Sequence, residues 1–416
     1  MISLACFQVS CMDPAEDSGF STRSIHADER EAREGVNVGD VVSPIHLSST
    51  YELDEVPTDT SLMDLDPGAG DFLYTRLGNP TRQLLEERMA SLAGGTDGFA
   101  VSSGTAAVLT TVLATARPGD EIVAFDDLYG GSLKLLSALA EERLGMSVNF
   151  VDARETDNVA AAMSEQTALV LMESPTNPLM HLCDIEAIAE LATEWGVPLA
   201  VDNTFASPVQ QRPLELGADI VIHSTTKYLN GHSDGLGGVV VTDDPAITEE
   251  MRFLQRIALG NVMPPFDAYL VLRGIKTLES RVQRQASNAA ALAAYLDDHD
   301  RVTSVYYPGL ESHPQHELAA RQMSGFGAML SFELDGTPKQ ARTFLESLEV
   351  FALAVSLGGV ESLIELPANM THESIDPAIR RERGISDTFV RVSVGIEDLD
   401  DLLADFDRGF TTAFGG

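Results

Sequence analysis

Cysteine and long apolar runs are scarce in this chain of 416 residues. The three cysteines, Cys6, Cys11 and Cys183, show no close pairing spacing, which argues against a disulfide framework or a zinc site. The histidines show no metal-ligand spacing, so we expect no metal. No apolar run reaches the roughly 18 residues of a membrane span, and the first residues lack the basic start of a signal peptide. These shortages favour a metal-free protein of the reducing cytoplasm.

Basic residues are also few, because 64 Asp and Glu stand against 27 Lys and Arg, for a formal net charge of −37. A surface this negative repels nucleic acid and anionic membranes, so we exclude both as partners. Only four of the basic residues are lysines, and the acidic residues are spread along the chain. This composition favours adaptation to high salt, where screening over a few ångströms makes a dense carboxylate surface tolerable. An ordinary acidic cytoplasmic enzyme is the alternative.

The pattern of apolar and helical segments predicts an α/β protein in three parts. Residues 1–76 show little periodicity and are interpreted as an N-terminal extension and arm. In residues 77–285 short apolar runs alternate with helical spacing, which predicts a large domain with a mostly parallel sheet covered on both faces. Residues 286–416 begin with a predicted helix at 288–299 and predict a smaller C-terminal α/β domain.

Seven apolar runs in the large domain are predicted strands. They cover residues 98–103, 121–127, 147–152, 168–174, 198–204, 219–225 and 237–243. In sheets of this kind ligands bind at the carboxyl ends of the strands. Polar residues that directly follow apolar runs are therefore the candidates for a functional site.

Three of these strand ends carry residues that suit one cofactor. In "SSGTAA" a strand turns into a helix at Gly104, where exposed N–H groups bind anions, although an ordinary helix cap looks the same. Asp202 follows the buried run "LAV", where a carboxylate needs a cationic partner unless it caps the next turn. Lys227 in "HSTTKY" follows hydroxyl side chains that suit a phosphate. A surface lysine is the alternative, in a chain that hardly uses lysine.

A phosphate cradle, a carboxylate for a pyridinium nitrogen and an amine for an aldehyde together describe pyridoxal 5′-phosphate (PLP). A nucleotide-binding protein without catalytic function would use the anion cradle but leave Asp202 and Lys227 without a role. The sequence therefore predicts a PLP-dependent enzyme in which the Lys227 amine joins the cofactor aldehyde as a Schiff base.

With these residues identified, the chain resembles the Cys/Met-metabolism PLP-dependent enzymes (trans-sulfuration enzymes) over residues 20–414. The motifs are, in order, "YTRLGNPTR", "SSGTAA", "DDLYGGS", "ESPTNPL", "VDNTFASP", "HSTTKYLNGHSD", "SLGGVESLIELPANMTH" and "RVSVGIED". An aminotransferase would share the Asp and the Lys but not the first or the seventh motif. The resemblance implies the fold-type I PLP-dependent transferase fold with a seven-stranded sheet. It also implies a small amino-acid substrate and a homo-oligomer, typically a tetramer built as a dimer of dimers.

The resemblance implies roles for individual residues. Lys227 and Tyr129 would be catalytic, because Lys227 would bind PLP and move protons while Tyr129 would stack on the cofactor ring. Asp202 would pair with the ring nitrogen. The other cofactor-binding residues would be Ser103, Gly104, Thr105, Asn177, Thr204, Ser224 and Thr226, with Tyr74 and Arg76 reaching the phosphate bound by the neighbouring subunit. The substrate-binding residues would be Arg391, for the α-carboxylate, and Ser356, Leu357, Leu73 and Val355.

Motif details separate the members of the family. The likeness is greatest to cystathionine γ-synthase and γ-lyase, which implies γ-elimination or γ-replacement on sulfur amino acids. Leu357 stands where enteric β-lyases tend to carry Trp, and Gly131 where methionine γ-lyases carry Cys. The apolar Leu73 and Val355 favour a different substrate. Cystathionine γ enzymes often carry acidic residues at these positions, which hold the distal amino group of the substrate. A buried ammonium without such a partner is costly. Methionine γ-lyase is therefore the second reading, and O-acylhomoserine sulfhydrylase the third.

The charge composition predicts a salt requirement. We expect the protein to be active in concentrated KCl and to lose activity on dialysis into low-salt buffer, because unscreened carboxylates repel one another. Activity measured before and after dialysis tests this expectation. Full activity at low salt would favour the ordinary acidic enzyme instead.

Overall fold

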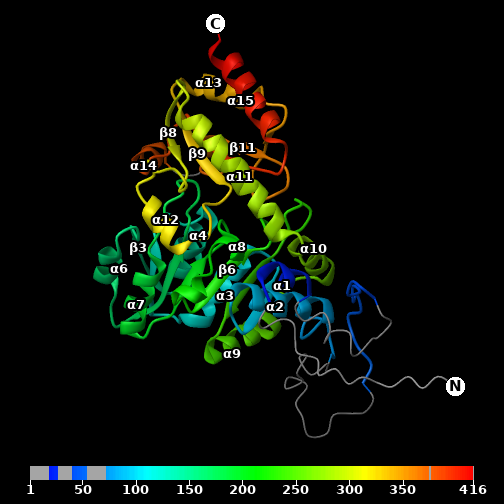
Figure 1. The fold of residues 1–416 in the computed structure, drawn as a ribbon. Coiled ribbons are helices and arrows are strands. Elements are labelled where there is room, and N and C mark those ends of the chain that lie inside the picture. Colours follow the sequence, from blue (N-terminus) through cyan, green and yellow to red (C-terminus); the bar gives the residue numbers. More distant parts are fainter. Residues whose placement is uncertain (1–17, 27–39, 54–71, 374–375, 416) are drawn as a thin grey trace, which may run out of the picture.

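The computed structural model describes residues 18–26, 40–53, 72–373 and 376–415. Most of the predicted arm, residues 1–76, lies outside these ranges. Figure 1 shows a larger body of blue, cyan and green elements and a smaller body of yellow to red elements. The long helix α11 (Leu278–Asp297) runs from one body into the other.

The larger body is built on a seven-stranded sheet with the strand order β1-β7-β6-β5-β4-β2-β3. The strands are β1 Asp97–Val101, β2 Glu121–Phe125, β3 Ser147–Val151, β4 Thr167–Glu173, β5 Leu199–Asp202, β6 Ile220–Ser224 and β7 Gly238–Thr242. Strand β7 runs antiparallel to β1 and β6, and the other neighbouring pairs are parallel. The seven predicted strands and their mostly parallel arrangement are therefore confirmed.

Helices cover both faces of this sheet. Helices α2 Pro80–Ala93 and α10 Pro265–Ile275 share one core with it, and α3 Gly104–Thr115, α7 Ile185–Trp195 and α9 Pro245–Phe253 share the other. On β6, Val221 belongs to the first core while Ile220 and Ile222 belong to the second. Successive side chains of a strand face opposite sides, so a sheet buried on both faces needs an unbroken apolar run. The shorter α-helices of the larger body are α1 Phe20–His26, α4 Gly130–Leu135, α5 Glu142–Leu144, α6 Thr156–Ala162 and α8 Ser207–Gln210. Its other helical segments are the π-helical Leu136–Glu141 and Leu254–Ala258 and the 3₁₀ turn Pro213–Leu216. A further 3₁₀ turn, Pro367–Asn369, lies in the smaller body.

The smaller body holds a five-stranded sheet in the order β10-β11-β12-β9-β8, antiparallel except for the pair β10 and β11. Its strands are β8 Val302–Tyr306, β9 Met329–Leu334, β10 Ala352–Leu353, β11 Leu363–Glu365 and β12 Phe389–Ser393. Its helices are α12 His316–Gln322, α13 Pro338–Glu346, α14 Pro377–Glu382 and α15 Leu399–Phe414. Two sheets of different topology thus share one chain.

Helix α11 begins ten residues before the helix predicted at 288–299. Its first ten residues bury Arg281 and Gln285 beside Leu278 and Val282, and the two polar side chains donate hydrogen bonds to backbone carbonyls. Helical periodicity is recognised from apolar side chains on the buried face. The polar side chains on this buried face therefore weaken the apolar pattern by which the start of the helix could have been predicted.

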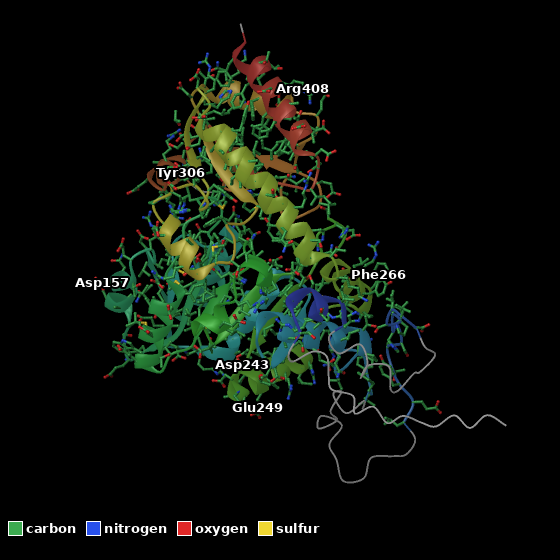
Figure 2. The ribbon with its side chains drawn as sticks, in the orientation of Figure 1. Asp157, Asp243, Glu249, Phe266, Tyr306 and Arg408 are labelled. Carbon is green, nitrogen blue, oxygen red and sulfur yellow. The ribbon has the colours of Figure 1, made fainter. Side chains whose placement is uncertain are left out.

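The acidic residues of the larger body that Figure 2 labels, Asp157, Asp243 and Glu249, are exposed at its outer edge. None of the helices in the described ranges is long and apolar enough to cross a membrane.

Asp405 on α15 is a buried carboxylate that connects this last helix to the loop between α13 and β10. It accepts hydrogen bonds from the backbone N–H groups of Glu349, Val350 and Phe351 at 2.8–3.0 Å and pairs with Arg408. Burial by itself raises the pKa of Asp405, but these donors outweigh it and hold the pKa below the usual value.

We expect Asp405→Asn to lower the free energy of unfolding by about 1–3 kcal/mol, because the amide cannot accept from all these donors. Urea-induced unfolding measures the loss. The contribution should be present above the unfolded pKa of the carboxyl and disappear as pH falls through the lowered folded pKa. Asp401→Asn, at an exposed carboxylate of the same helix, is the matched control and should have little effect. Equal stability of the two variants would contradict this account.

Candidate active site

A cavity of about 400 Å³ lies at the carboxyl ends of β4, β5 and β6 and is closed by residues of the smaller body. From the larger body it is lined by Ser103, Gly104, Thr105, Val108, Tyr129, Gly130, Gly131, Ser132, Glu173, Asn177, Asp202, Thr204, Phe205, Ser224, Thr226, Lys227 and Leu236. From the smaller body it is lined by Val355, Ser356, Leu357, Thr371 and Arg391. The residues predicted as a site thus gather here, except for Leu73, Tyr74 and Arg76.

The start of helix α3 forms one wall of this cavity. The Ser103 hydroxyl caps the helix by accepting from the backbone N–H of Ala106 at 3.0 Å, and the first N–H groups of a helix have no intrahelical acceptor. A Cβ on Gly104 would come within 2.8 Å of the Ser224 Cβ, so glycine lets the helix start approach the end of β6. These N–H groups and the Ser224 hydroxyl could hold a phosphate. The Thr226 hydroxyl already bonds the backbone of Gly237.

Asp202 ends β5 inside the cavity wall. One of its oxygens accepts from the backbone N–H of Thr204 at 3.1 Å and from the Thr204 hydroxyl at 2.5 Å. The same hydroxyl accepts from the backbone N–H of Ser224 at 2.9 Å, so Thr204 joins the ends of β5 and β6. Burial raises the pKa of Asp202, while Thr204 and Lys227 oppose that rise. A cationic ring nitrogen placed beside this carboxylate would offset the free-energy cost of burying its charge.

Lys227 projects into the cavity, where its Nζ donates to the Ser356 hydroxyl at 3.0 Å. Burial and then the nearby Arg391 lower the pKa of Lys227 to about 8, against the opposing effect of Glu365 and Asp202. Ser356 has a φ of 88°, which is rare for a residue other than glycine and is found at functional sites held by their surroundings. Its carbonyl accepts from Arg391 Nη2 at 2.8 Å, which helps to hold this backbone in place.

Arg391 lies on β12 and is fixed by contacts from both bodies. Its Nη1 donates to the Asn177 side-chain oxygen at 3.0 Å and is 3.0 Å from a Glu365 carboxylate oxygen. Its guanidinium lines the cavity and could bind a carboxylate there.

Three polar groups of the site were not singled out from the sequence. Glu173 is buried at the end of β4, where its oxygens accept from the backbone N–H groups of Tyr129 at 2.7 Å and Asn177 at 3.2 Å. It directly follows an apolar run, which is the signal that marked Asp202. Thr371 and Glu365 lie in a quoted motif, but no local pattern shows that Glu365 pairs with Arg391 or that Thr371 donates to Glu365.

Leu73, Tyr74 and Arg76 do not line this cavity of their own chain. Tyr74 is 44% exposed and forms an isolated β-bridge with Thr50. Arg76 donates to the backbone carbonyl of Arg256. The expectation that Tyr74 and Arg76 reach a neighbouring subunit stays a prediction.

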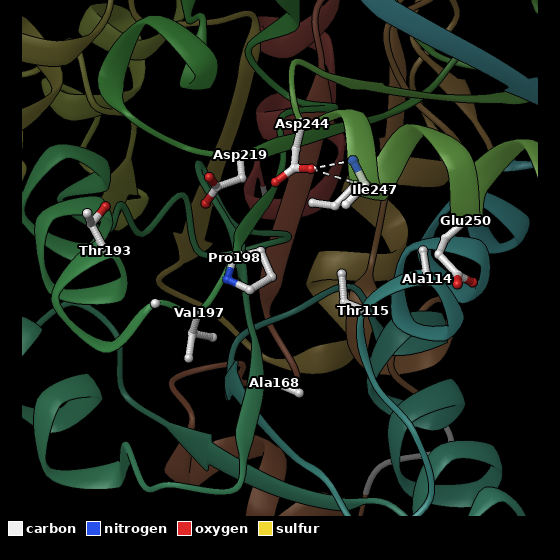
Figure 3. Close-up of a pocket in the computed structure, with 12 residues that line it drawn as sticks. Ala114, Thr115, Ala168, Thr193, Val197, Pro198, Asp219, Asp244, Ile247 and Glu250 are labelled. Carbon is white, nitrogen blue, oxygen red and sulfur yellow. Dashed lines mark hydrogen bonds between the residues drawn. The ribbon is translucent and has the colours of Figure 1, made fainter.

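A second cavity, of about 410 Å³, lies at the opposite end of the sheet strands (Figure 3). The carboxylates of Asp219, Asp244 and Glu250 line it, together with the carboxyl-terminal turns of α3 and α7. Asp244 accepts from the backbone N–H of Ile247 at 3.2 Å as the cap of α9. No basic side chain is among its described lining residues, so it lacks the groups that gather in the first cavity.

The comparisons with known proteins agree with the chemistry of the first cavity. Residues 21–411 match the family described as Cys/Met metabolism PLP-dependent enzyme, and the chain belongs to this family. Its cofactor is therefore PLP, and the residues of the cavity fit it. They combine an anion cradle, a carboxylate whose pKa is raised by burial and a lysine amine.

Its relatives carry more than one activity in their names. The chain is 44% identical to cystathionine gamma-lyase of Dictyostelium discoideum, over 94% of this chain and 97% of that protein. It is 45% identical to cystathionine beta-lyase of Coxiella burnetii, with the same shares covered. The structure of cystathionine gamma synthase from Xanthomonas oryzae pv. oryzae in complex with cystathionine is 42% identical, with a TM-score of 0.89, covering 96% of this chain and 99% of that one. Overall identity does not select one reaction among them.

Within the described residues, no three His, Cys, Asp or Glu side chains are grouped so as to hold a metal ion.

We expect Lys227→Ala to abolish covalent attachment of PLP and to reduce turnover by about 10²–10⁴-fold or more, because the amine predicted to join the aldehyde and to move protons is gone. The visible absorbance of the purified protein, and its mass after borohydride reduction, measure the attachment. Lys339→Ala, on the exposed side of α13, is the control and should keep both. Normal turnover in Lys227→Ala would refute the assignment.

Proposed function

We propose that this chain catalyses PLP-dependent γ-elimination or γ-replacement on sulfur amino acids, as cystathionine γ-synthase and γ-lyase do in trans-sulfuration. The observation that carries the proposal is the meeting of Lys227, Asp202 and Arg391 in one cavity. They are an amine for an aldehyde, a carboxylate for a ring nitrogen and a cation for an amino-acid carboxylate. The relatives named for cystathionine support the same class of substrate.

Bound PLP supplies an electron sink for carbanion chemistry. Lys227 binds the cofactor and, once free, moves protons at the substrate carbons. Its pKa of about 8 leaves part of the amine unprotonated near neutral pH, so it can accept a proton. The Ser356 hydroxyl, 3.0 Å away, orients this amine. With PLP bound, Asp202 would keep the ring nitrogen protonated, and Tyr129 would stack on the ring.

The remaining residues position cofactor and substrate. The start of α3 at Ser103, Gly104 and Thr105, with the hydroxyls of Ser224 and Thr226, binds the phosphate. Asn177 would lie near the ring hydroxyl of bound PLP, and Thr204 orients Asp202. Arg391 binds the substrate α-carboxylate beside Ser356, Leu357 and Val355.

Tyr74 and Arg76 complete the site of a neighbouring subunit in this proposal. Both lie outside the cavity of their own chain, and Arg is suited to a bidentate phosphate contact. The protein would then be a homo-oligomer, a tetramer built as a dimer of dimers. We propose a salt-adapted cytoplasmic enzyme, in line with the net charge of −37.

Gly131 supports the cystathionine γ reading over methionine γ-lyase. A Cβ at this position would come within 2.3 Å of the Tyr129 ring. A cysteine there, as in methionine γ-lyases, would therefore require the ring to move.

Val355 supports methionine γ-lyase as the second candidate. It lines the cavity and is 54% exposed, where an acidic residue would be expected to hold a distal ammonium. Leu73 is apolar as well but lies outside this cavity. O-acylhomoserine sulfhydrylase comes third, because no contact favours it.

A substrate panel separates these reactions. Purified enzyme in concentrated KCl with added PLP is assayed for 2-oxobutanoate release from cystathionine and from methionine, and for cystathionine formation from O-acylhomoserine and cysteine. We expect cystathionine to be turned over in one of the two directions. Faster turnover of methionine would make methionine γ-lyase the function.

Val355→Glu tests how the cavity chooses its substrate. We expect it to raise the ratio of kcat/KM for cystathionine to that for methionine by about tenfold, or about 1.4 kcal/mol, since a carboxylate would pair with the distal ammonium. Ile379→Glu, at a similarly exposed residue of α14, is the matched control and should leave the ratio unchanged. An unchanged ratio in Val355→Glu would mean that the distal ammonium binds elsewhere.

A further inference from the structure

Glu365 and Arg391 form an ion pair behind the cavity wall. They are direct cross-strand partners in the antiparallel pair β11 and β12, with a carboxylate oxygen 3.0 Å from the guanidinium nitrogen. Their side chains are 0% and 3% exposed. Of the two, only Arg391 lines the cavity. An incoming ligand therefore meets the cation first, with the carboxylate behind it.

This ion pair leaves one buried polar atom of each side chain without a hydrogen-bond partner among the described residues. One Glu365 oxygen, Oε1, contacts Arg391 Nη1 and accepts from the Thr371 hydroxyl at 2.7 Å. The other oxygen, Oε2, and Arg391 Nε are buried, and neither finds a hydrogen-bond partner among the described residues. A bidentate pair between the two side chains would use both oxygens and would hold the cation more tightly.

We propose that Glu365 is a positioning residue that orients Arg391 toward the cavity and limits how tightly it binds the α-carboxylate of substrate and product. The carboxylate of Glu365 repels a second carboxylate brought to the same guanidinium, and this repulsion is stronger for buried side chains than for exposed ones. Tight binding of substrate and product alike would not speed the reaction and would slow release. Glu365 can act in this way only if Arg391 binds the α-carboxylate, so the inference rests on the proposed function.

Glu365→Gln separates this role from a purely structural one. The glutamine oxygen can still accept from Arg391 and from the Thr371 hydroxyl, while the negative charge is removed. A purely structural Glu365 predicts that the variant binds carboxylates more weakly, because Arg391 is less well held. A repelling Glu365 predicts tighter binding.

The experiment compares glycine with glycinamide, which lacks the carboxylate, as ligands of the PLP-loaded enzyme. Their dissociation constants are read from the change in the visible spectrum. In Glu365→Gln we expect the constant for glycine to fall by about tenfold and that for glycinamide to stay unchanged. With the amino-acid substrate, KM and kcat should fall together. An unchanged or weaker affinity for glycine overturns the inference.

Arg391→Lys distinguishes failure of the inference from failure of the proposed function. It keeps a cation but loses the planar fork, so glycine should bind more weakly while glycinamide does not change. If Arg391→Lys does not weaken glycine binding, the proposed carboxylate site itself is wrong. If it does and Glu365→Gln fails to tighten binding, only the role of Glu365 is wrong.

The wild-type enzyme gives a test that does not depend on the folding of a variant. Burial raises the pKa of Glu365, against the opposing effects of Arg391, Thr371 and Lys227, and His372 bonds Thr371 beside it. As pH falls through this raised pKa, Glu365 becomes neutral, so the preference for glycine over glycinamide should rise. Lys227, whose pKa is about 8, also lies near Arg391, so the ratio is followed well below that pH, where the charge of Lys227 no longer changes. A ratio that does not change with pH counts against the inference.

Discussion

Five acidic and basic side chains are partly or fully buried around one cavity, and the rest of the site depends on how their charges are compensated. Lys227 and Arg391 are the basic residues, and Glu173, Asp202 and Glu365 are the carboxyl groups. Burying an ion without a partner is costly, so each of these groups influences the others. The lowered pKa of Lys227 shows the balance, since burial and Arg391 lower it while Glu365 and Asp202 oppose the change.

Two bodies of different architecture are needed to build this arrangement. In the mostly parallel sheet, Asp202 and the residues before Lys227 lie at the carboxyl ends of the neighbouring strands β5 and β6, because parallel strands end on the same side of the sheet. The second sheet supplies Arg391 and the loop of Ser356. Helix α11 ties the two together with a polar stripe in which Arg281 donates to the carbonyl of Tyr228, next to Lys227, and Gln285 to that of Gly359, near Ser356. The cavity is therefore a property of the joined bodies.

This chain is similar to relatives that are named for different reactions of cystathionine, because the residues that would hold PLP and an amino-acid carboxylate do not depend on which of these reactions follows. The groups that would hold PLP and an amino-acid carboxylate suit every member of the family, and they occupy most of the cavity wall. We expect the difference at the positions that would meet the distal part of a substrate. In this chain Val355 lines the cavity, and Gly131 leaves room for the Tyr129 ring.

The amino-acid sequence was enough to predict the seven strands, the turn at Gly104 and the place of Asp202 and Lys227 at the ends of strands. Each of these is a local signal, namely an unbroken apolar run followed at once by a polar residue. It was not enough to predict that Arg391 contacts Asn177, 214 residues away, or that Glu365 lies behind Arg391. The first contact arises where the two bodies meet, and the second arises from the register of β11 and β12. No local pattern records which buried charge will meet which. The chemistry of the site was thus readable in the chain, whereas its electrostatic balance was decided by tertiary packing.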